Sequence, residues 1–502
     1  MDRDVTQPFF ELLARMRNTP NHISPVAYDT AWLAWLYPQA RSWLSQAQYP
    51  DGSWGSEVEY YHDRVVSTLA AINAIAATSI NGHDLNRLER GIRYLERAIP
   101  RLEQDVFETV GFELLVPMLV QTGKKLGLKL DKVEALIEPV KAIYRKKMAL
   151  IPRELIYSPQ VVVAHSLEFV GFEALDEQAI PALRAMNGSI HNSPSATAFV
   201  EIAGPGSVEG RAYLDTLMKR YHGVAPGFAP FELFEIIWVL YHISLMSDLR
   251  DLRPKIDLFV DFLETVWTER GVGFSVTFLP DPDDASLAFR ILHKLGKMQD
   301  PSFLEQYEVG DHFQCLPLER NISLDVHIHI IDALKESMDF PRRDDMLLKA
   351  LNILGRDLTT DYIVDKWHIS PYYSTSHAVI TLTGLSDNII KKQIKWLLKT
   401  QRPDGSWTFY PEHPKAAIEE TAYTLMALMT VYEKKGNIPF EVIERGHRYL
   451  ADHYRGSEEL PALWINKALY NPYHIVDAVI LSALCKYEQL FERSALSLVG
   501  SW

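Results

Sequence analysis

A seven-residue sequence occurs twice in this chain of 502 residues, at 48–54 and again at 401–407. The first copy reads Gln-Tyr-Pro-Asp-Gly-Ser-Trp, and the second has Arg in place of Tyr. Pro restricts φ, Asp bonds forward along the backbone and Gly accepts a positive φ, so each copy predicts a tight turn. We expect the Trp to stack on the preceding helix and the Gln to satisfy the end of that helix. The repeat indicates two related helical barrels built of hairpins joined by this turn.

Helical periodicity dominates the rest of the chain. Apolar residues recur at steps of three and four in these segments: 65–77, 85–98, 231–245, 255–267, 346–354 and 422–432. Alternating strand patterns are scarce, and connections rich in Pro, Gly and Asn separate the helical segments. The sequence therefore predicts an almost entirely α-helical fold.

Bulk composition restricts the function classes. The formal charge of 51 − 65 = −14 argues against nucleic acid as a partner. Cys315 and Cys485 lie in no metal-binding spacing and fit a reduced, cytoplasmic compartment. The sequence contains no apolar run of transmembrane length, so we expect a soluble protein without a transmembrane segment. Aromatic residues make up 11% of the chain, which suits a pocket for an apolar or cationic ligand.

Residues 281–284 read Asp-Pro-Asp-Asp and stand at the start of an apolar helical segment. Crowded carboxylates beside apolar residues repel one another, so one of them tends to keep its proton at neutral pH. A protonated acid against an apolar wall is suited to protonating a carbon–carbon double bond. Two other interpretations fit the same residues, namely a helix N-cap and a metal-binding loop.

Several motifs, in their order along the chain, resemble those of bacterial class II diterpene cyclases, which are related to squalene–hopene cyclases. The resemblance covers nearly the whole chain and rests on the repeated turns and on these segments: 27–32, 62–64, 67–70, 111–113, 187–189, 193–195, 281–284, 366–373 and 419–423. It implies an all-α fold of two α/α-barrel domains, called β and γ. Residues 1–45 would hold the first helix of β, 46–244 the inserted γ domain, and 245–502 the remainder of β with the acid motif.

The resemblance implies protonation-initiated cyclisation of geranylgeranyl diphosphate to a bicyclic diterpenyl diphosphate, with the copalyl type, including the ent series, as the main expectation. Alternatives are a rearranged halimadienyl or kolavenyl diphosphate, or drimenyl diphosphate from farnesyl diphosphate. The residues add an independent restriction, because neither aspartate pair completes the DDxxD motif that ionises diphosphates: Leu348 follows Asp344-Asp345, and Leu287 follows Asp283-Asp284, where the motif has its last Asp. We therefore expect the diphosphate to survive. The product would pass to a separate class I synthase or phosphatase, and a homodimer is compatible with the sequence.

The resemblance also assigns roles to residues. Asp283 would donate the proton, while Asp281 and Asp284 would tune and reprotonate it. His165 and Asn187 would hold the water that takes the final proton. Residues implied to contact the substrate are Arg64, Lys147 and Lys366 at the diphosphate, and Trp238, Phe274, Trp367, Tyr372 and Tyr373 around the cations. Each of these aromatic residues also fits ordinary core packing.

Mg²⁺, associated with the diphosphate, would bind Glu103, Asp105 and Glu108, although a solvated helix end explains the same three residues. Asp325 stands in segment 321–327, where relatives have Asn before a His, so the hydrogen bonding of the acid in relatives does not carry over to this chain.

Two other classes compete with the cyclase. Paired carboxylates and many aromatic residues suit an α/α-barrel glycosidase. A non-catalytic prenyl-binding protein would also use such a barrel.

Overall fold

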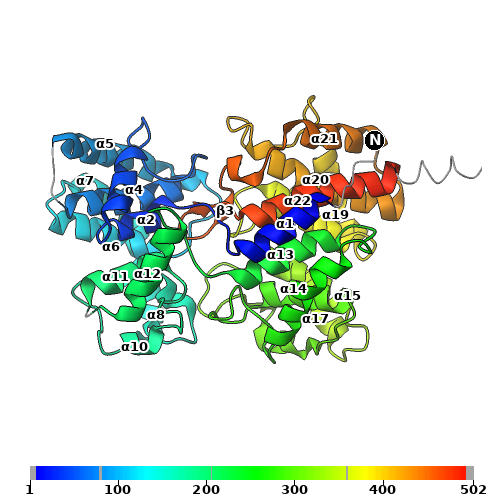
Figure 1. The fold of residues 1–502 in the computed structure, drawn as a ribbon, viewed down its shortest axis with the longest axis horizontal. Helices are drawn as coiled ribbons and strands as arrows, with labels where there is room; N and C mark the ends of the chain where they lie inside the picture. Colours follow the sequence, from blue (N-terminus) through cyan, green and yellow to red (C-terminus); the bar gives the residue numbers. More distant parts are fainter. Residues whose placement is uncertain (1–6, 79–81, 205, 358–359, 493–502) are drawn as a thin grey trace, which may run out of the picture. The chain divides into compact units, whose positions relative to one another are not determined.

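The structure is a computed structural model that describes residues 7–78, 82–204, 206–357 and 360–492. The chain forms two compact units (Figure 1). Unit 1 consists of residues 1–22, 231–461 and 471–502, and unit 2 consists of residues 23–230 and 462–470. Both units are helical, and two short hairpins supply the strands of the described residues. The predicted all-α class is confirmed.

Unit 1 is a closed ring of helices covered by outer helices. Around the ring each inner helix contacts the next, and the last contacts the first, in the order α13 (Glu232–Ser244), α15 (Pro282–Lys294), α16 (Leu324–Lys335), α18 (Pro371–Leu382), α20 (Ala416–Lys435) and α22 (Tyr473–Tyr487). Helices α13, α18 and α20 are buried along almost their whole length, as central helices must be. The outer helices are α1 (Gln7–Asn18), α14 (Arg253–Val266), α17 (Arg343–Asp357), α19 (Asp387–Lys399) and α21 (Phe440–His453).

Unit 2 has a smaller ring of the same kind. Its inner helices follow one another in the closed order α2 (Ala27–Leu33), α4 (Tyr61–Ala76), α6 (Phe112–Lys125), the 3-10 helix η2 (Val162–Val170) and α11 (Pro194–Ala203). Around them lie α3 (Pro38–Gln46), α5 (Gly82–Ala98), η1 (Ile99–Gln104), α7 (Asp131–Leu136), α8 (Glu138–Leu150), α9 (Arg153–Ile156), α10 (Ile180–Leu183) and α12 (Val208–Arg220). The hairpin of β3 (Trp464–Ile465) and β4 (Leu469–Tyr470) also belongs to unit 2. The remaining short elements, all in unit 1, are η3 (Pro301–Tyr307), β1 (Glu308–Val309), β2 (His312–Phe313), η4 (Ser457–Glu459) and η5 (Glu488–Glu492).

The two units differ in their boundaries from the predicted domains. Residues 23–45 lie in unit 2, because α2 packs against α4 and α11 and closes that ring. Residues 231–244 lie in unit 1, because α13 packs between α22 and α15. The sequence offered no signal for residues 462–470, a segment of the C-terminal part of the chain that belongs to unit 2.

The repeated heptapeptide forms the same turn in both units. The indole N–H of Trp54 donates to the carbonyl oxygen of Leu44 at 2.8 Å, and that of Trp407 donates to Leu397 at 2.7 Å. Each Trp thus satisfies the end of the preceding helix, which the sequence had assigned to the Gln. The side chain of Gln48 donates to the carbonyl oxygen of Gly52 in its own turn and to that of Arg87 in α5, the second helix after the turn.

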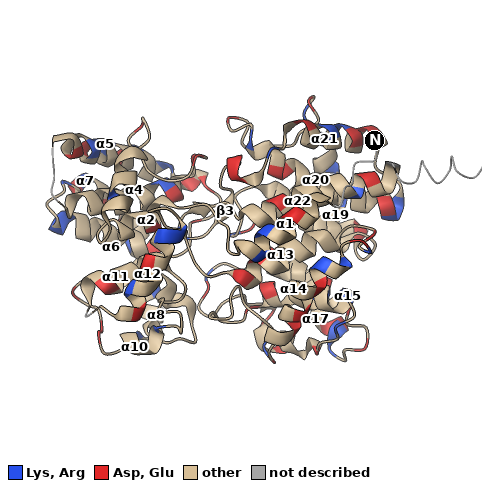
Figure 2. Ribbon diagram, in the orientation of Figure 1, with Lys and Arg blue, Asp and Glu red and all other residues tan. Residues whose placement is uncertain are grey.

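Acidic and basic residues are interspersed over the helices of each unit (Figure 2). Within the described residues, no helix combines the length and the apolar character needed to cross a membrane.

Candidate active site

The acid motif begins α15, an inner helix of unit 1. Oδ1 of Asp281 accepts hydrogen bonds from the backbone N–H groups of Asp283 at 2.9 Å and Asp284 at 3.0 Å. Asp281 is therefore the N-cap of α15, and Pro282 occupies the first helical position, where its missing N–H costs nothing. The cap and the catalytic interpretation are compatible, because capping occupies Asp281 and leaves the carboxyl of Asp283 available.

Burial raises the pKa of both carboxyl groups that flank Asp283. Burial is the main reason that the pKa of Asp281 rises to about 7, and the neighbouring Asp283 adds to the rise. Burial and the charge of Asp281 raise the pKa of Asp284 well above its ordinary value. Because these two groups hydrogen-bond each other, the pair keeps a proton at neutral pH. Burial outweighs the opposing effect of the helix N-terminus on these groups.

Asp283 is the first member of a hydrogen-bonded chain that continues through two buried histidines. Its Oδ1 lies 2.6 Å from Nδ1 of His329 on α16, and Nε2 of His329 lies 2.9 Å from Nδ1 of His377 on α18. The side chain of Asp283 is 14% exposed, whereas that of His329 is fully buried. Burial and the nearby His329 lower the pKa of His377 well below its ordinary range, so His377 is neutral. Three inner helices thus bring the acid and its partners together inside the ring of unit 1.

Aromatic side chains surround this chain of polar groups. The indole N–H of Trp238 donates to the hydroxyl of Tyr373 at 3.1 Å, and the Trp238 ring lies 5.9 Å from that of His329. The ring of Tyr373 lies 4.4 Å from that of His377. Trp238 and Tyr373, both predicted from the sequence, therefore lie beside the partners of the acid, where π faces can stabilise a cation.

The other three predicted aromatic residues have different surroundings in unit 1. Tyr372 stacks on Trp396 of the outer helix α19 at 4.6 Å, so core packing accounts for it. Phe274 packs on Phe278 at 4.0 Å, and the Trp367 ring lies 5.1 Å from Nζ of Lys366. A substrate contact at Phe274 or Trp367 stays a prediction.

We expect Asp281→Asn to stabilise the protein increasingly as the pH rises. The pKa of Asp281 is about 7 in the fold against an ordinary 3.8, so its stabilising contribution is complete below pH 3.8 and is lost as the pH rises through 7. Asn keeps the acceptor for the two backbone N–H groups but does not ionise. The Tm of the variant minus that of the wild type should therefore rise by about 2–4 °C between pH 5 and pH 8. Thermal unfolding of both proteins across this range measures it, and a constant difference would contradict it.

His165, the predicted base, lies on η2 in unit 2. Its Nδ1–H donates to the carbonyl oxygen of His191 at 2.9 Å, which assigns proton acceptance to Nε2. Burial, and next the charge of Lys467, lower the pKa of His165 to about 3, so the ring is neutral at pH 7. The side chain of Asn466 hydrogen-bonds the ring and favours its protonated form. A neutral imidazole with such a partner is suited to accepting a proton.

Asn187, the predicted partner of His165, instead shapes a turn. Its Oδ1 accepts hydrogen bonds from the backbone N–H of Ser189 at 3.0 Å and from the Ser189 hydroxyl at 2.7 Å. Asp51 makes the same two bonds to Ser53, at 2.9 and 2.7 Å, in the first repeated turn. Gly188 has a φ of 87°, and a Cβ there would collide with the backbone of α12. Residues 187–189 are therefore a third, diverged copy of that turn. Asn466 hydrogen-bonds the ring of His165, and a catalytic role of Asn187 stays a prediction.

The two predicted diphosphate-binding lysines are ion-paired. Lys147 Nζ lies 2.7 Å from Oε1 of Glu113 in unit 2. In unit 1, Lys366 pairs with Glu319 and donates to the carbonyl oxygen of Asn321 at 2.9 Å. A diphosphate would have to compete with or join these carboxylates, and the role of both lysines in binding stays a prediction.

Arg64, the third basic residue, holds the first repeated turn together. Its guanidinium donates to the Ser53 hydroxyl and, at 3.2 Å, to the Glu57 carbonyl oxygen, and it lies 4.0 Å above the ring of Tyr49. Its side chain is 6% exposed. These contacts are sufficient to explain Arg64 as a structural residue.

We therefore expect Arg64→Met to lower the free energy of unfolding by about 2 kcal/mol, because it removes two hydrogen bonds from a buried charge. The KM for the substrate should stay within about twofold, in contrast to the loss expected of a diphosphate ligand. Denaturant unfolding and steady-state kinetics measure the two quantities. Arg93→Met is the control, because Arg93 is 55% exposed and its pair with Glu89 contributes little. A tenfold rise of KM in Arg64→Met would instead support the predicted role of Arg64 in binding the diphosphate.

Comparison with known proteins places this geometry in a family. The chain is 32% identical over 490 residues to a type B diterpene cyclase of Mycobacterium tuberculosis, covering 92% of this chain and 96% of that protein. The chain belongs to the class II diterpene cyclases. It is also 28% identical to the chloroplastic ent-copalyl diphosphate synthase of Arabidopsis thaliana, over 70% of this chain and 45% of that longer protein. No protein-family model matches the chain.

A solved structure supports the same assignment. The ent-copalyl diphosphate synthase of Streptomyces platensis superposes with a TM-score of 0.79 and 25% identity, over 96% of this cyclase and 99% of that chain. The glycosidase and prenyl-binding alternatives are not favoured. As a class II diterpene cyclase the protein is an isomerase that starts cyclisation by protonation.

The three acidic residues predicted to hold Mg²⁺ lie at and after the end of η1. Among the residues that the structure describes, no group of three or more His, Cys, Asp or Glu side chains is placed to hold a metal ion. Asp105 accepts a hydrogen bond from the backbone N–H of His62 and lies 2.8 Å from its Nδ1, while Glu103 is exposed. Glu108 is part-buried. Binding of Mg²⁺ by these three residues stays a prediction.

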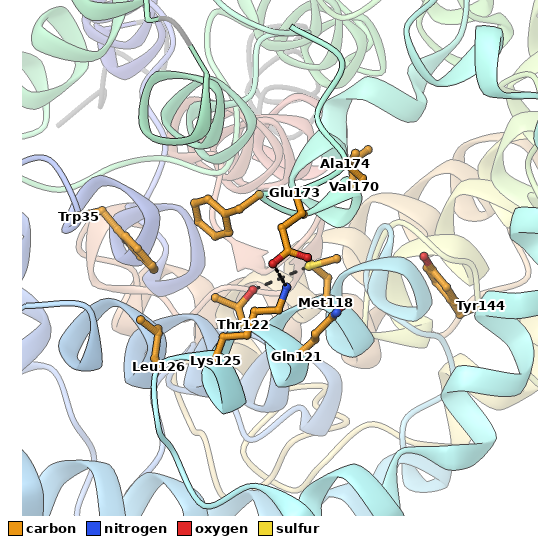
Figure 3. Close-up of a pocket in the computed structure, with 12 residues that line it drawn as sticks. Trp35, Met118, Gln121, Thr122, Lys125, Leu126, Tyr144, Val170, Glu173 and Ala174 are labelled. Atoms are coloured by element: carbon orange, nitrogen blue, oxygen red, sulfur yellow. Dashed lines mark hydrogen bonds and ion pairs between the residues drawn. The ribbon is translucent and has the colours of Figure 1, made fainter.

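A cleft of about 420 Å³ opens in unit 2 of the cyclase, beside α6 and the segment that follows η2 (Figure 3). Trp35 and Tyr144 contribute to its walls, and an ion pair joins Lys125 and Glu173 at 2.8 Å. None of the predicted site residues lines it. We therefore assign the cleft no part in the reaction.

Two residues beside the acid escaped the sequence analysis, His329 and His377. The family motif had been placed so that its His fell on His327, but Nε2 of His327 accepts a hydrogen bond from the backbone N–H of Phe313 at 3.1 Å. Residues two positions apart on a helix point in different directions, so only His329 faces Asp283. Asp325, noted for replacing Asn, accepts a hydrogen bond from Ser374 on α18 at 2.9 Å rather than bonding the acid.

Proposed function

We propose that this cyclase converts geranylgeranyl diphosphate into a bicyclic diphosphate of the copalyl type and leaves the diphosphate intact. The observation that carries the proposal is the carboxyl of Asp283 inside a ring of buried helices, 2.6 Å from His329 and beside Trp238 and Tyr373. The likeness to copalyl diphosphate synthases over most of the chain supports the product type. The absence of a DDxxD motif from the sequence supports retention of the diphosphate.

The first step transfers the carboxyl proton of Asp283 to the terminal double bond of the prenyl chain. The π electrons of the alkene form the new C–H bond, and the O–H electrons remain on Asp283 as a carboxylate. Because an alkene is a weak base, this step needs a dry acid whose conjugate base is stabilised. The Nδ1–H of His329 supplies that stabilisation by donating to Oδ1 of Asp283.

The resulting tertiary cation is attacked by the next double bond, and a second attack closes the second ring. Aromatic faces such as those of Trp238 and Tyr373 stabilise such cations by about 1–2 kcal/mol each when water is excluded. Nε2 of His165, directly or through one water, then removes a proton from the carbon beside the final cation. The C–H electrons form the product double bond, so one proton enters and one leaves, and the reaction is an isomerisation.

Mg²⁺ enters this proposal as the counter-ion of the substrate diphosphate rather than as an ion held by Glu103, Asp105 and Glu108, because those residues do not gather into a site. The product keeps its diphosphate, so the enzyme that consumes it is of a class that ionises or hydrolyses allylic-type diphosphates.

Product analysis tests the proposed function. The protein is incubated separately with geranylgeranyl and farnesyl diphosphate and Mg²⁺, the products are dephosphorylated, and the alcohols are identified by mass spectrometry and NMR. We expect a bicyclic alcohol of the copalyl type from the geranylgeranyl substrate. Only linear alcohols from both substrates would overturn the proposal, and a rearranged skeleton would limit it to the first cyclisation.

His165→Ala should change the product rather than the rate of protonation. Without the base, the final cation is quenched by water or rearranges by hydride and methyl shifts. We expect hydroxylated or rearranged products to exceed the deprotonated product, while substrate consumption stays within about tenfold of the wild type, because protonation at Asp283 is unaffected. The same product assay measures both quantities. An unchanged product from the folded variant would remove His165 from this role.

A further inference from the structure

Lys467 is a fully buried lysine for which the reaction has no direct use. It lies between β3 and β4 in unit 2, and its side chain has no exposed surface. Its Nζ donates to the carbonyl oxygen of His165 at 2.9 Å, to Oε1 of Glu168 at 3.0 Å and to the hydroxyls of Ser193 and Ser195. A buried ammonium is costly unless such partners surround it, so its retention indicates a specific task.

These contacts join the two segments that orient the base. His165 and Glu168 belong to η2, whereas Ser193 and Ser195 begin α11 directly after the turn that contains His191. The hydrogen bond from Nδ1 of His165 to the carbonyl oxygen of His191 runs between the same two segments. Lys467 therefore fixes the spacing across which that bond forms.

We propose that Lys467 is a positioning residue for the terminating base. It holds η2 against the start of α11 so that Nδ1 of His165 donates to the carbonyl oxygen of His191, which makes Nε2 the ring nitrogen that accepts the proton. This inference rests on the proposed function, since it presupposes that His165 ends the cyclisation. It assigns to the β3–β4 hairpin a part in choosing the product.

The charge of Lys467 acts in the same direction as its hydrogen bonds. After burial, Lys467 is the largest cause of the lowered pKa of His165, so it helps to keep the imidazole unprotonated before a cation arrives. Glu168 at 3.0 Å and Asp29 at 4.0 Å balance the charge of the Lys467 ammonium. A carbocation is a far stronger acid than an imidazolium, so a weakly basic His165 still accepts its proton.

A merely structural lysine would affect stability, whereas a positioning residue also affects the product ratio. Lys467→Met keeps the length of the side chain and removes its hydrogen bonds and charge. In the folded variant we expect the ratio of hydroxylated and rearranged products to deprotonated product to rise at least about tenfold, with a smaller change in substrate consumption. Lys467→Arg, which keeps the charge and several donors, should restore part of the deprotonated product.

Lys486→Met is the matched control. Lys486 is 2% exposed in unit 1, and it donates to the Leu245 carbonyl oxygen and to Glu433. It should lose stability like Lys467→Met but keep the wild-type product ratio. If Lys467→Met does not fold, Ser195→Ala, which removes a single acceptor of Lys467, decides in its place. A wild-type product ratio in the folded variant, or an equal shift in the control, would overturn the inference.

Failure of the proposed function has a different signature. If the wild-type protein leaves geranylgeranyl diphosphate linear, the cyclisation itself is wrong. If the wild type cyclises and His165→Ala shifts the product but Lys467→Met and Ser195→Ala do not, only the role of Lys467 is wrong.

Discussion

Replacing Asp283 by Asn should lower the turnover of geranylgeranyl diphosphate at least about 10³-fold, toward the upper end of what general acids contribute. The Asn amide is nearly isosteric with the carboxyl but has no proton acidic enough for an alkene. Its oxygen can still accept the hydrogen bond from Nδ1 of His329, which lies 2.6 Å from Oδ1 of Asp283. The Tm should therefore stay within about 2 °C of the wild type. Substrate depletion and thermal unfolding measure the two effects.

The control for this variant is Asp344→Asn. Asp344 lies in the first turn of α17, and its side chain is 88% exposed beside Arg343. Together with Asp345 it forms the second Asp-Asp pair of the chain, which a search for diphosphate-ionising motifs would also select. We expect wild-type turnover from it. Residual turnover above one hundredth of the wild type in Asp283→Asn would show that another group donates the proton.

The two barrels were predictable from the sequence because their signals are local. Each repeated turn needs Asp, Gly and Trp at fixed positions, and these residues make equivalent bonds in the two units. Helices such as α13 and α20 were equally visible from their apolar content. The domain boundaries were not, because whether α2 or α13 closes one ring or the other depends on packing between segments that are distant in sequence.

The acidic motif at 281–284 was recognisable in the sequence for a similar reason, and the hydrogen-bond partners of Asp283 were not. Three carboxylates in four residues at the start of an apolar helix are an unusual local pattern. His329 and His377 lie on other helices. His329 bonds Asp283 and His377 bonds His329 only after the ring closes, so a single sequence holds no local sign of them. The role of Asn187 in catalysis stays a prediction, because an Asn-Gly-Ser turn looks the same in sequence whether its amide faces a ligand or its own backbone.

His329→Phe should lower kcat about 30- to 150-fold and leave KM nearly unchanged. The imidazole N–H stabilises the carboxylate that appears on Asp283 as the proton leaves, and a hydrogen bond to a charged group contributes about 2–3 kcal/mol. Phe fills the same space within the aromatic surroundings, where Trp238 lies 5.9 Å away, but it donates no proton. Because the contact strengthens only when the charge forms, its loss appears in kcat rather than in KM.

Two further variants separate this role from packing. His329→Asn places an amide N–H close to the position of Nδ1, so it should recover kcat to within about tenfold of the wild type. His327 lies on the same helix as His329 and accepts a hydrogen bond from the backbone N–H of Phe313. His327→Phe removes that acceptor, so it should lower stability without lowering kcat in the folded fraction. If His329→Phe turned over substrate at the wild-type rate, Asp283 would have to be acidic enough without its partner. The buried, proton-sharing pair of Asp281 and Asp284 would then be the group that sets its acidity.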